Sequence, residues 1–393
     1  MSTRKLLSLW DQSAPKSYMS LALCFPLDTS KCSREDVLHH IQKAAKRLAA
    51  KRPDYAGRLI VDGRIPGAPK TSVFIETSPD DYIRVEELDV DFGTSYDELK
   101  RDGFPFRKFV NPGFTLALPF TPDSLPVPVS LLRVLFIDRG FVLFTHLHHS
   151  YADGKGVDTF LEQLADEARN IDGPLGPVET VSCDSFSELL EKCPKYKLRE
   201  EATESSTPSS PQQLRAKEWG QMERVGKNFV MDITKNWIEP RKKLVVNEPS
   251  KVSYFGNAVV VVLAETPNIK TASDLVKACN WETSPMDVLE IAQAIMQSNR
   301  AVDEDFVFAR TAMFAARPNH IHELDLFLDP RKPHHFSANT WAFIGHNAKF
   351  EFPGVDMTDN DGLPDAIRRV QAGWAMPHAL IMPTWPEIGE DEV

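Results

Sequence analysis

Hydrophobic and polar residues follow two different periods along the first part of the chain. The run from Ser17 to Leu27, SYMSLALCFPL, is almost continuously apolar and predicts a strand. After Ser33 the apolar residues recur every three to four positions as far as Leu48, which predicts an amphipathic helix. Ser33 and Asp36 have the spacing of an N-terminal cap, and Pro53 follows the end of the helix. This part of the chain therefore mixes strands and helices.

The middle of the chain predicts a hairpin, a polar corner and a second helix. Two β-rich runs, 129–137 and 141–149, are separated by the short polar connection Asp138-Arg139-Gly140, which is a hairpin signal. From Val157 to Ala168 the apolar residues again follow helical spacing. The sequence HHSYADG, residues 148–154, therefore forms a corner between a strand and a helix, where polar groups can face a cleft.

The second half repeats the alternation of strands and helices. Residues 201–213, EATESSTPSSPQQ, are polar, rich in Pro and Ser, and typical of a linker. After them the pattern predicts strands at 252–265, 305–316 and 340–352 and helices at 285–298 and 363–374. We expect two α/β domains of related design, residues 1–175 and 221–393, joined by a linker over residues 176–220.

Composition narrows the class of protein. Hydrophobic residues make up 42% of the chain and charged residues 26%, as in globular proteins. The net charge of −11 argues against a nucleic-acid partner, because such binding needs a basic surface. The apolar run 258–264, AVVVVLA, is far shorter than a membrane span, and the N-terminus lacks the apolar run of a signal peptide. We expect a cytoplasmic protein without a membrane partner.

Cysteines and histidines outside the corner do not predict a metal site. The five cysteines are scattered and form no CxxC pair, so neither disulfides nor a structural zinc site is indicated. His320 and His322 share one face of a strand but have no third ligand at a suitable spacing. No GxGxxG, P-loop or GxSxG sequence occurs, so nucleotide cofactors and a serine-hydrolase elbow are not indicated.

The corner itself is the main candidate for chemistry. Histidine is the side chain whose free pKa lies near neutrality, so His149 is a residue of the type that can take a proton from a hydroxyl group and return one to a leaving group. Asp153, four residues later, can orient the loop, and Gly154 permits backbone angles that other residues resist. His148 precedes this pair. An isolated HxxxD is short and also fits polar residues that simply end a strand. The preceding strand and following helix favour a catalytic corner.

The sequence around the corner resembles the superfamily that contains the BAHD acyltransferases, the fungal acetyltransferases of secondary metabolism and the condensation domains of peptide synthetases. HHSYADG is similar to their active-site motif. The N-terminal stretch LLSLWDQSAPKSYMSLALCFPL resembles the opening of fungal BAHD-like enzymes. Further similarities are the segments TSPMDVLEIAQAI and WAFIGHNA in the second half.

This resemblance implies two chloramphenicol acetyltransferase-like α/β domains with an active-site channel between them. It implies that His149 is the general base of an acyl-CoA-dependent O-acyltransferase, most simply an acetyltransferase acting on a secondary metabolite. Asp153 is expected to hold the loop by pairing with an arginine from the other half, either Arg317 or Arg310. The enzyme would bind no permanent cofactor, would use acetyl-CoA or another acyl-CoA as co-substrate, and would act as a monomer.

The resemblance also suggests supporting residues around the channel. Gly345 and Asn347 match the family's Gly-x-Asn strand near the acceptor, and Trp341 either lines the acceptor tunnel or packs in the core. An oxyanion donor is expected from the backbone near Gly154 or from a hydroxyl near Ser284.

One departure from the family pattern leaves other functions open. The family's second motif, Asp-Phe-Gly-Trp-Gly, does not occur near the C-terminus, which raises the alternative that the second half is truncated. Three hypotheses for the function follow. The chain is an acyl-CoA acyltransferase, or a non-catalytic relic that binds ligands, or a condensation-type domain that uses a carrier-protein thioester.

Overall fold

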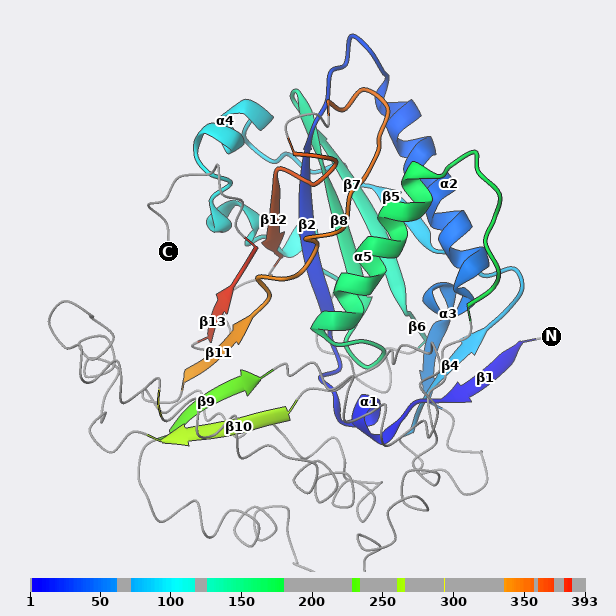
Figure 1. Cartoon of the computed structure of the whole chain (residues 1–393), viewed down its shortest axis with the longest axis vertical. Helices are drawn as coiled ribbons and strands as arrows, with labels where there is room; N and C mark the ends of the chain where they lie inside the picture. The colour runs from blue at the N-terminus through cyan, green and yellow to red at the C-terminus, as the bar shows by residue number, and fades with distance from the viewer. Residues whose placement is uncertain are drawn as a thin grey trace, which may run out of the picture.

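The structure is a computed structural model, shown in Figure 1, which describes residues 2–61, 72–116, 126–179, 228–233, 260–265, 293, 336–356, 360–370 and 378–383. The described strands form three sheets. The predicted helix 285–298, apart from Gln293, the predicted strand 305–316 and the linker sequence 201–213 lie outside the described residues. No helix of the described part of the chain is long and apolar enough to cross a membrane.

A five-stranded sheet forms the centre of the described structure, in the order β12-β2-β8-β7-β5. Strand β2 (Tyr18–Pro26) pairs antiparallel with β8 (Gly140–His148), which pairs antiparallel with β7 (Ser130–Ile137). Strand β5 (Arg84–Glu87) runs parallel to β7. The β7–β8 hairpin and the strand predicted at Ser17 to Leu27 are thus confirmed.

Both faces of this sheet are covered. Helices α2 (Arg34–Lys51) and α5 (Gly154–Arg169) lie against one face, and α4 (Tyr96–Arg101) lies on the other side (Figure 1). Alternate residues of β2 belong to different cores, because successive side chains of a strand point to opposite faces. Leu21 and Leu23 join the core on the helical side, whereas Ala22 and Cys24 join the core on the other side. This two-sided burial explains why the run from Ser17 to Leu27 is almost continuously apolar.

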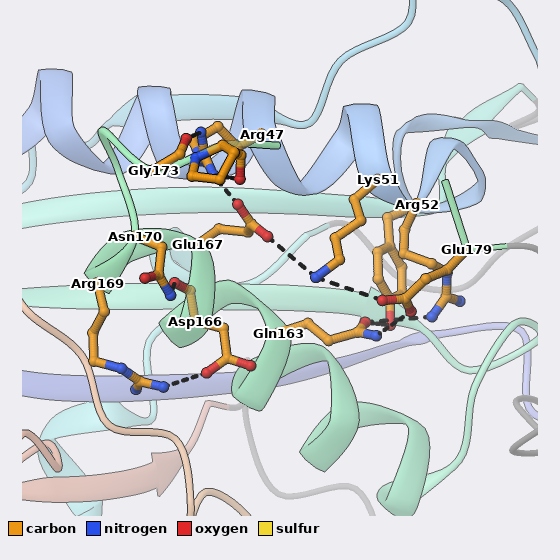
Figure 2. A network of polar contacts seen from close by, with 12 residues as sticks. Arg47, Lys51, Arg52, Gln163, Asp166, Glu167, Arg169, Asn170, Gly173 and Glu179 are labelled. Carbon is orange, nitrogen blue, oxygen red and sulfur yellow. Dashed lines mark hydrogen bonds and ion pairs between the residues drawn. The ribbon is translucent and has the colours of Figure 1, made fainter. Parts of the chain in front are cut away.

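The two helices on the sheet form as the sequence predicts. Ser33 and Asp36 make a complete capping box at the start of α2, and Pro53 begins the next short helix, α3 (Pro53–Ala56). Between α2 and α5, the buried carboxylate of Glu167 accepts from Arg47 Nε at 2.8 Å and from Lys51 Nζ at 3.4 Å (Figure 2). This polar contact joins the two helices at their facing sides.

Two smaller sheets complete the described strands. The first has the order β1-β4-β3-β6 and the second the order β10-β9-β11-β13. Short helices lie between the strands of the N-terminal part. The remaining bounds are β1 (Thr3–Leu6), α1 (Leu9–Ser13), β3 (Arg58–Val61), β4 (Val73–Thr77), the 3-10 turns Phe106–Phe109 and Pro112–Phe114, β6 (Val127–Pro128), β9 (Asn228–Ile233), β10 (Val260–Glu265), β11 (Phe336–Thr340) and β13 (His378–Ile381).

The segment 341–370 packs against the N-terminal part of the chain. Its strand β12 (Ala366–Arg369) pairs antiparallel with β2 at the edge of the central sheet. Beside this strand, the buried phenol of Tyr96 donates to Asp365 at 2.8 Å. Arg368 donates to the carbonyl oxygens of Phe104 and Gly103. The central sheet is therefore built from residues that lie more than two hundred positions apart in the sequence.

Two predictions for this segment are wrong. Residues 342–347 form turns, not the strand predicted at 340–352, because the backbone of Gly345 takes the left-handed conformation, φ +79°. Residues 366–369 form a strand, not part of the helix predicted at 363–374. The exposed edge of β2 offers backbone hydrogen bonds to Ala366 and its neighbours, and this tertiary pairing overrides the local helical pattern.

Candidate active site

The HHSYADG corner connects β8 to α5 and is anchored on both sides by backbone hydrogen bonds. His148 N–H donates to the carbonyl of Val129 at 2.9 Å, and His149 N–H donates to that of Ser17 at 2.8 Å. Within the corner, the N–H of Tyr151 donates to the carbonyl of His148 at 2.9 Å. The corner is therefore a defined turn and not a loose loop.

The first two histidines of this region, His146 and His148, are buried. Burial, with smaller contributions from Lys16 and His149, lowers the pKa of His148 to about 3. Burial and, less strongly, Arg133 lower the pKa of His146 to about 3. Both rings are thus neutral near neutral pH and poor proton acceptors.

Each of these buried rings also has a structural partner. Nδ1 of His148 accepts the backbone N–H of Ser150 at 3.1 Å, so this nitrogen carries no proton. Nδ1 of His146 lies 2.8 Å from the hydroxyl of Ser20 on the paired strand β2. The ring of Tyr18 packs edge-on against that of His148, with centroids 4.9 Å apart. Through these contacts both rings stabilise the corner and the end of β8.

His149 differs from both neighbours because its side chain is only partly buried. It follows the last residue of β8 and lies at the turn before α5. Among the histidines at this end of β8, His149 is therefore the least buried.

Asp153 is buried and begins α5. Its backbone is extended, φ −100° and ψ −169°, and its Oδ1 accepts the N–H of Gly156 at 3.0 Å. This is the geometry of a helix N-cap, in which the carboxylate satisfies an N–H that has no partner within the helix. The predicted arginine partners, Arg317 and Arg310, lie outside the described residues, as does Ser284.

Gly154 lies where the segment 341–370 meets the corner. A Cβ placed on Gly154 would lie 3.5 Å from Nε1 of Trp341 and 3.8 Å from Cζ of Phe343. Trp341 is buried in the core that includes α5, and the guanidinium of Arg369 lies 5.7 Å from the centre of its ring. The structure thus brings Trp341 next to the first residue of the helix that follows His149.

Gly345 and Asn347 each donate a hydrogen bond to an acidic side chain of α5. The N–H of Gly345 donates to Oδ1 of the buried Asp158 at 2.8 Å, and Asn347 Nδ2 donates to Glu162 Oε1 at 3.0 Å. Sequence reasoning missed Asp158, because its partner is a backbone group that lies 187 positions away. Its place one turn into an otherwise apolar helix face is the signal that could have identified it.

Sequence reasoning also missed the partners of Tyr151, which lies inside the corner. Its hydroxyl donates to Asp54, and Arg52 Nη2 donates to the same hydroxyl at 3.0 Å. Arg52 and Asp54 come from the junction of α2 and α3. No sequence pattern predicts that an arginine and an aspartate beside a helix end will contact a tyrosine far along the chain.

The described residues offer no group of three or more His, Cys, Asp or Glu side chains that could hold a metal ion. What the arrangement does offer is a partly exposed histidine, His149, on a turn that is held by backbone hydrogen bonds. Such a group can accept a proton from a bound alcohol and deliver it to a leaving group.

Comparison with known proteins shows what the N-terminal part of the chain is similar to. Residues 17–167 match the family model described as the trichothecene 3-O-acetyltransferase-like N-terminal domain. Acyltransferase cm3D of Cordyceps militaris is 24% identical to this chain over 171 residues, which are 40% of this chain and 34% of that protein. The matched segment thus spans about a third of the length of the curated relatives.

The chain is also similar in fold to solved structures. Apo TRI101 of F. graminearum aligns with a TM-score of 0.61 at 18% identity, covering 98% of this chain and 92% of that one. TRI101 of F. sporotrichioides, solved with coenzyme A and T-2, aligns with a TM-score of 0.60 at 18% identity, covering 98% and 93%. The family match and the curated relatives confirm the resemblance to BAHD-like acyltransferases. The solved structures show that the mixed α/β fold is of the same kind.

Proposed function

We propose that the chain is an acyl-CoA-dependent O-acyltransferase, most simply an acetyltransferase, that acylates a hydroxyl group of a secondary metabolite. The family match over residues 17–167 supports this proposal. So do the curated relatives, which are named acyltransferases. The TRI101 structures contain coenzyme A with T-2 or deoxynivalenol, both small-molecule ligands of those enzymes.

The observation that carries the proposal is the different burial of the corner histidines. His146 and His148 are buried, with their pKa values lowered to about 3, whereas His149 is partly exposed on a fixed turn. A general base needs access to the substrate and a defined position. In this corner His149 combines the two.

In the proposed reaction His149 takes the proton from the acceptor hydroxyl as its oxygen attacks the thioester carbonyl carbon. The carbonyl π electrons move to oxygen and form a tetrahedral oxyanion. When this intermediate collapses, the C–S bond breaks and the imidazolium gives its proton to the departing CoA thiolate. The products are an ester and free CoA, and His149 is again neutral. No covalent enzyme intermediate and no permanently bound cofactor are required.

Other residues are assigned supporting roles in the proposal. Asp153 holds the corner, both as the cap of α5 and through an arginine of the second half, for which Arg317 is the first candidate. The oxyanion donor is a backbone N–H near Gly154 or a hydroxyl near Ser284. Trp341 is assigned to the acceptor side.

The proposed architecture has two halves, residues 1–175 and 221–393, with the linker 176–220 between them. The active-site channel runs between the halves, so that acyl-CoA and acceptor reach His149 from different sides. We propose that the enzyme acts as a cytoplasmic monomer.

The test of the function is thiol release. The purified protein is incubated with acetyl-CoA and a panel of hydroxylated terpenoids, polyketides and alkaloids, and free thiol and acceptor mass are measured together. The proposal expects thiol release that depends on the acceptor, with the acceptor gaining the mass of one acetyl group. Longer acyl-CoA thioesters, tested in the same way, define the acyl group.

Two control arms separate the alternatives. The first arm supplies the acyl group on the phosphopantetheine of a carrier protein. If the chain is a condensation-type domain, it should turn over with the carrier and not with acyl-CoA. If the chain is a non-catalytic relic, a folded sample, shown by its cooperative unfolding transition, should give no turnover with any donor. Either result would reject the proposed function.

A further inference from the structure

Tyr151 lies at the centre of the corner, two residues after His149 and two before Asp153. It is 3% exposed, and burial is the main reason that the pKa of its phenol is raised well above the ordinary value. The phenol therefore remains protonated and acts as a hydrogen-bond donor. Its hydroxyl contacts Arg52 and Asp54, which come from a different part of the N-terminal fold.

These three residues form a closed arrangement, here called the Arg52–Asp54–Tyr151 clamp. Arg52 holds both carboxylate oxygens of Asp54, with Nε 3.1 Å from Oδ1 and Nη2 2.9 Å from Oδ2. The same Nη2 donates to the hydroxyl of Tyr151 at 3.0 Å, and that hydroxyl donates to Asp54 Oδ2. Each member therefore contacts both others. A planar guanidinium paired with a carboxylate in this way has little freedom to rotate.

A second set of contacts lies beside the clamp. The guanidinium of Arg52 lies over the ring of Tyr55, 4.4 Å from its centre, and Arg52 Nη1 donates to Gln163 at 3.3 Å. Tyr55 also donates to Gln163, at 2.8 Å, and Gln163 donates to Glu179 at 2.9 Å. Figure 2 shows Arg52, Gln163 and Glu179 gathered at one end of the polar network between α2 and α5.

We propose that Tyr151 is a positioning residue, which sets the place of the His149 imidazole by tying the corner to Arg52 and Asp54. The inference rests on the proposed function of His149. The peptide N–H of Tyr151 already holds the carbonyl of His148 at 2.9 Å, so a shift of Tyr151 is passed directly to the backbone that carries His149. Small displacements of a catalytic group are costly, because the base must meet the acceptor hydroxyl within hydrogen-bond distance.

The clamp has features that packing alone does not require. A phenylalanine would fill the same volume at position 151, and Asp54 and Arg52 would still pair with each other. The hydroxyl adds a link between the corner and the α2–α3 junction. Its loss is therefore expected to loosen the corner while the fold remains.

The first experiment compares Tyr151→Phe with Tyr55→Phe. Each variant removes one buried phenol hydroxyl from the same network, but only Tyr151 belongs to the corner. The expected result is a fall in kcat of about tenfold or more for Tyr151→Phe, with the KM for acyl-CoA changed less than about twofold. Tyr55→Phe is expected to keep kcat within about twofold of wild type. Equal kcat in both variants would overturn the inference, since a purely structural role would lower only their melting temperatures.

A double-mutant cycle tests whether the clamp acts as one unit. Asp54→Asn is expected to lower kcat as Tyr151→Phe does, because the neutral amide no longer pairs with Arg52 in the same way. The double variant is expected to lose no more than about twofold beyond the worse single variant. Multiplying losses would show that the two side chains act independently, and would contradict the clamp.

An assay without turnover separates this inference from the proposed function. Diethyl pyrocarbonate modifies exposed neutral imidazoles, and peptide mass spectrometry gives the modification rate of His149 alone. We expect Tyr151→Phe to change this rate about threefold or more, and Tyr55→Phe to leave it within about twofold. An inactive wild type in which Tyr151→Phe still changes the His149 rate would refute the acyltransferase and keep the coupling. An active wild type with an unchanged rate and an unchanged kcat in Tyr151→Phe would refute the positioning role alone.

Discussion

At the scale of single residues, the surroundings of each imidazole decide what it can do. His146 and His148 share one face of β8, each with Nδ1 in contact with a neighbouring group. His149, on the following turn, is partly exposed. Neighbours in sequence thus divide into two structural rings and one candidate base.

The buried pair predicts a loss of stability in mild acid. Both folded-state pKa values are lowered from 6.5 to about 3, so the unfolded chain binds protons that the folded chain does not. The stability contributed by each neutral ring is complete above about pH 6.5 and is lost as the pH falls toward about 3. We expect each ring to account for about 1 kcal/mol of the fall in unfolding free energy between about pH 7.5 and about pH 5.5.

Urea unfolding at the two pH values checks this expectation. His146→Gln removes one titrating ring and should reduce the pH-dependent loss by about 1 kcal/mol, whatever its effect at neutral pH. His39→Gln, at an exposed position of α2, serves as the control and should leave the loss unchanged. An unaltered pH dependence in His146→Gln would contradict the neutral, buried state of that ring.

At the scale of elements, helix α5 is attached at two places. The corner caps its first turn, and residues 341–347 contact its side. Asp153 accepts the Gly156 N–H, and Asp158 accepts the Gly345 N–H. Variants at Asp153 and at Gly345 test the cap of α5 and the packing of the turn beside it.

The first concerns the two roles assigned to Asp153. Asp153→Ala should lower the unfolding free energy by about 1 kcal/mol or more, because the cap is lost, and Asp153→Ser should restore most of that. Turnover should remain low in both variants, because serine cannot replace the carboxylate that is proposed to pair with Arg317. Recovery of turnover in Asp153→Ser would show that Asp153 serves as a helix cap alone.

The second concerns the turn at Gly345. This residue has φ +79°, and a Cβ there would lie 2.4 Å from Cδ1 of Ile367. Gly345→Ala should therefore cost about 3 kcal/mol, the sum of left-handed backbone strain and overpacking. Gly103 has φ +70° with nothing within 4 Å, so Gly103→Ala should cost about 1 kcal/mol from the backbone alone. Equal unfolding free energies for the two variants would mean that the turn does not pack against β12.

Elements that carry a clear local pattern could be predicted. The hairpin, the strand β2 and the capping of α2 follow from local patterns and were confirmed. The helix predicted at 363–374 was wrong for a physical reason. Leu363, Ala366, Ile367 and Val370 fit helical spacing, but Ala366 and Ile367 are consecutive buried residues of an edge strand that is covered on both faces.

The site divides in the same way. His149, Asp153 and Gly154 were identified from one short motif, because its strand, turn and helix are neighbours along the chain. The roles of these residues in a reaction stay a prediction. The partners Arg52 and Asp54 could not be predicted, because they meet Tyr151 through the fold, across about a hundred positions. Local patterns predict the corner, and only the tertiary structure supplies what supports it.

At the scale of the whole molecule, the central sheet is completed by a late segment of the chain. Strand β12 covers the edge of β2, and Tyr96 and Asp365 join at its start. The proposed first half, residues 1–175, therefore lacks one of the strands of its own sheet.

This arrangement predicts the behaviour of fragments. Residues 1–175 alone should unfold without a cooperative transition and should bind a hydrophobic dye, because the edge of β2 and its apolar neighbours are uncovered. A second fragment, in which residues 360–370 are joined to residue 175 by a flexible linker, should recover a cooperative transition in urea. A cooperative transition in the first fragment would show that β12 is dispensable for folding.

The proposed role of His149 as the base of an acyl transfer is tested by one kinetic comparison. The kcat/KM for acetyl-CoA and an accepted alcohol is measured for wild type, His149→Ala and His39→Ala, the last being an exposed histidine far along the chain from the corner. We expect His149→Ala to lose a factor of about 10²–10⁴ with its melting temperature kept, and His39→Ala to match wild type. A folded His149→Ala that keeps wild-type turnover would contradict the account.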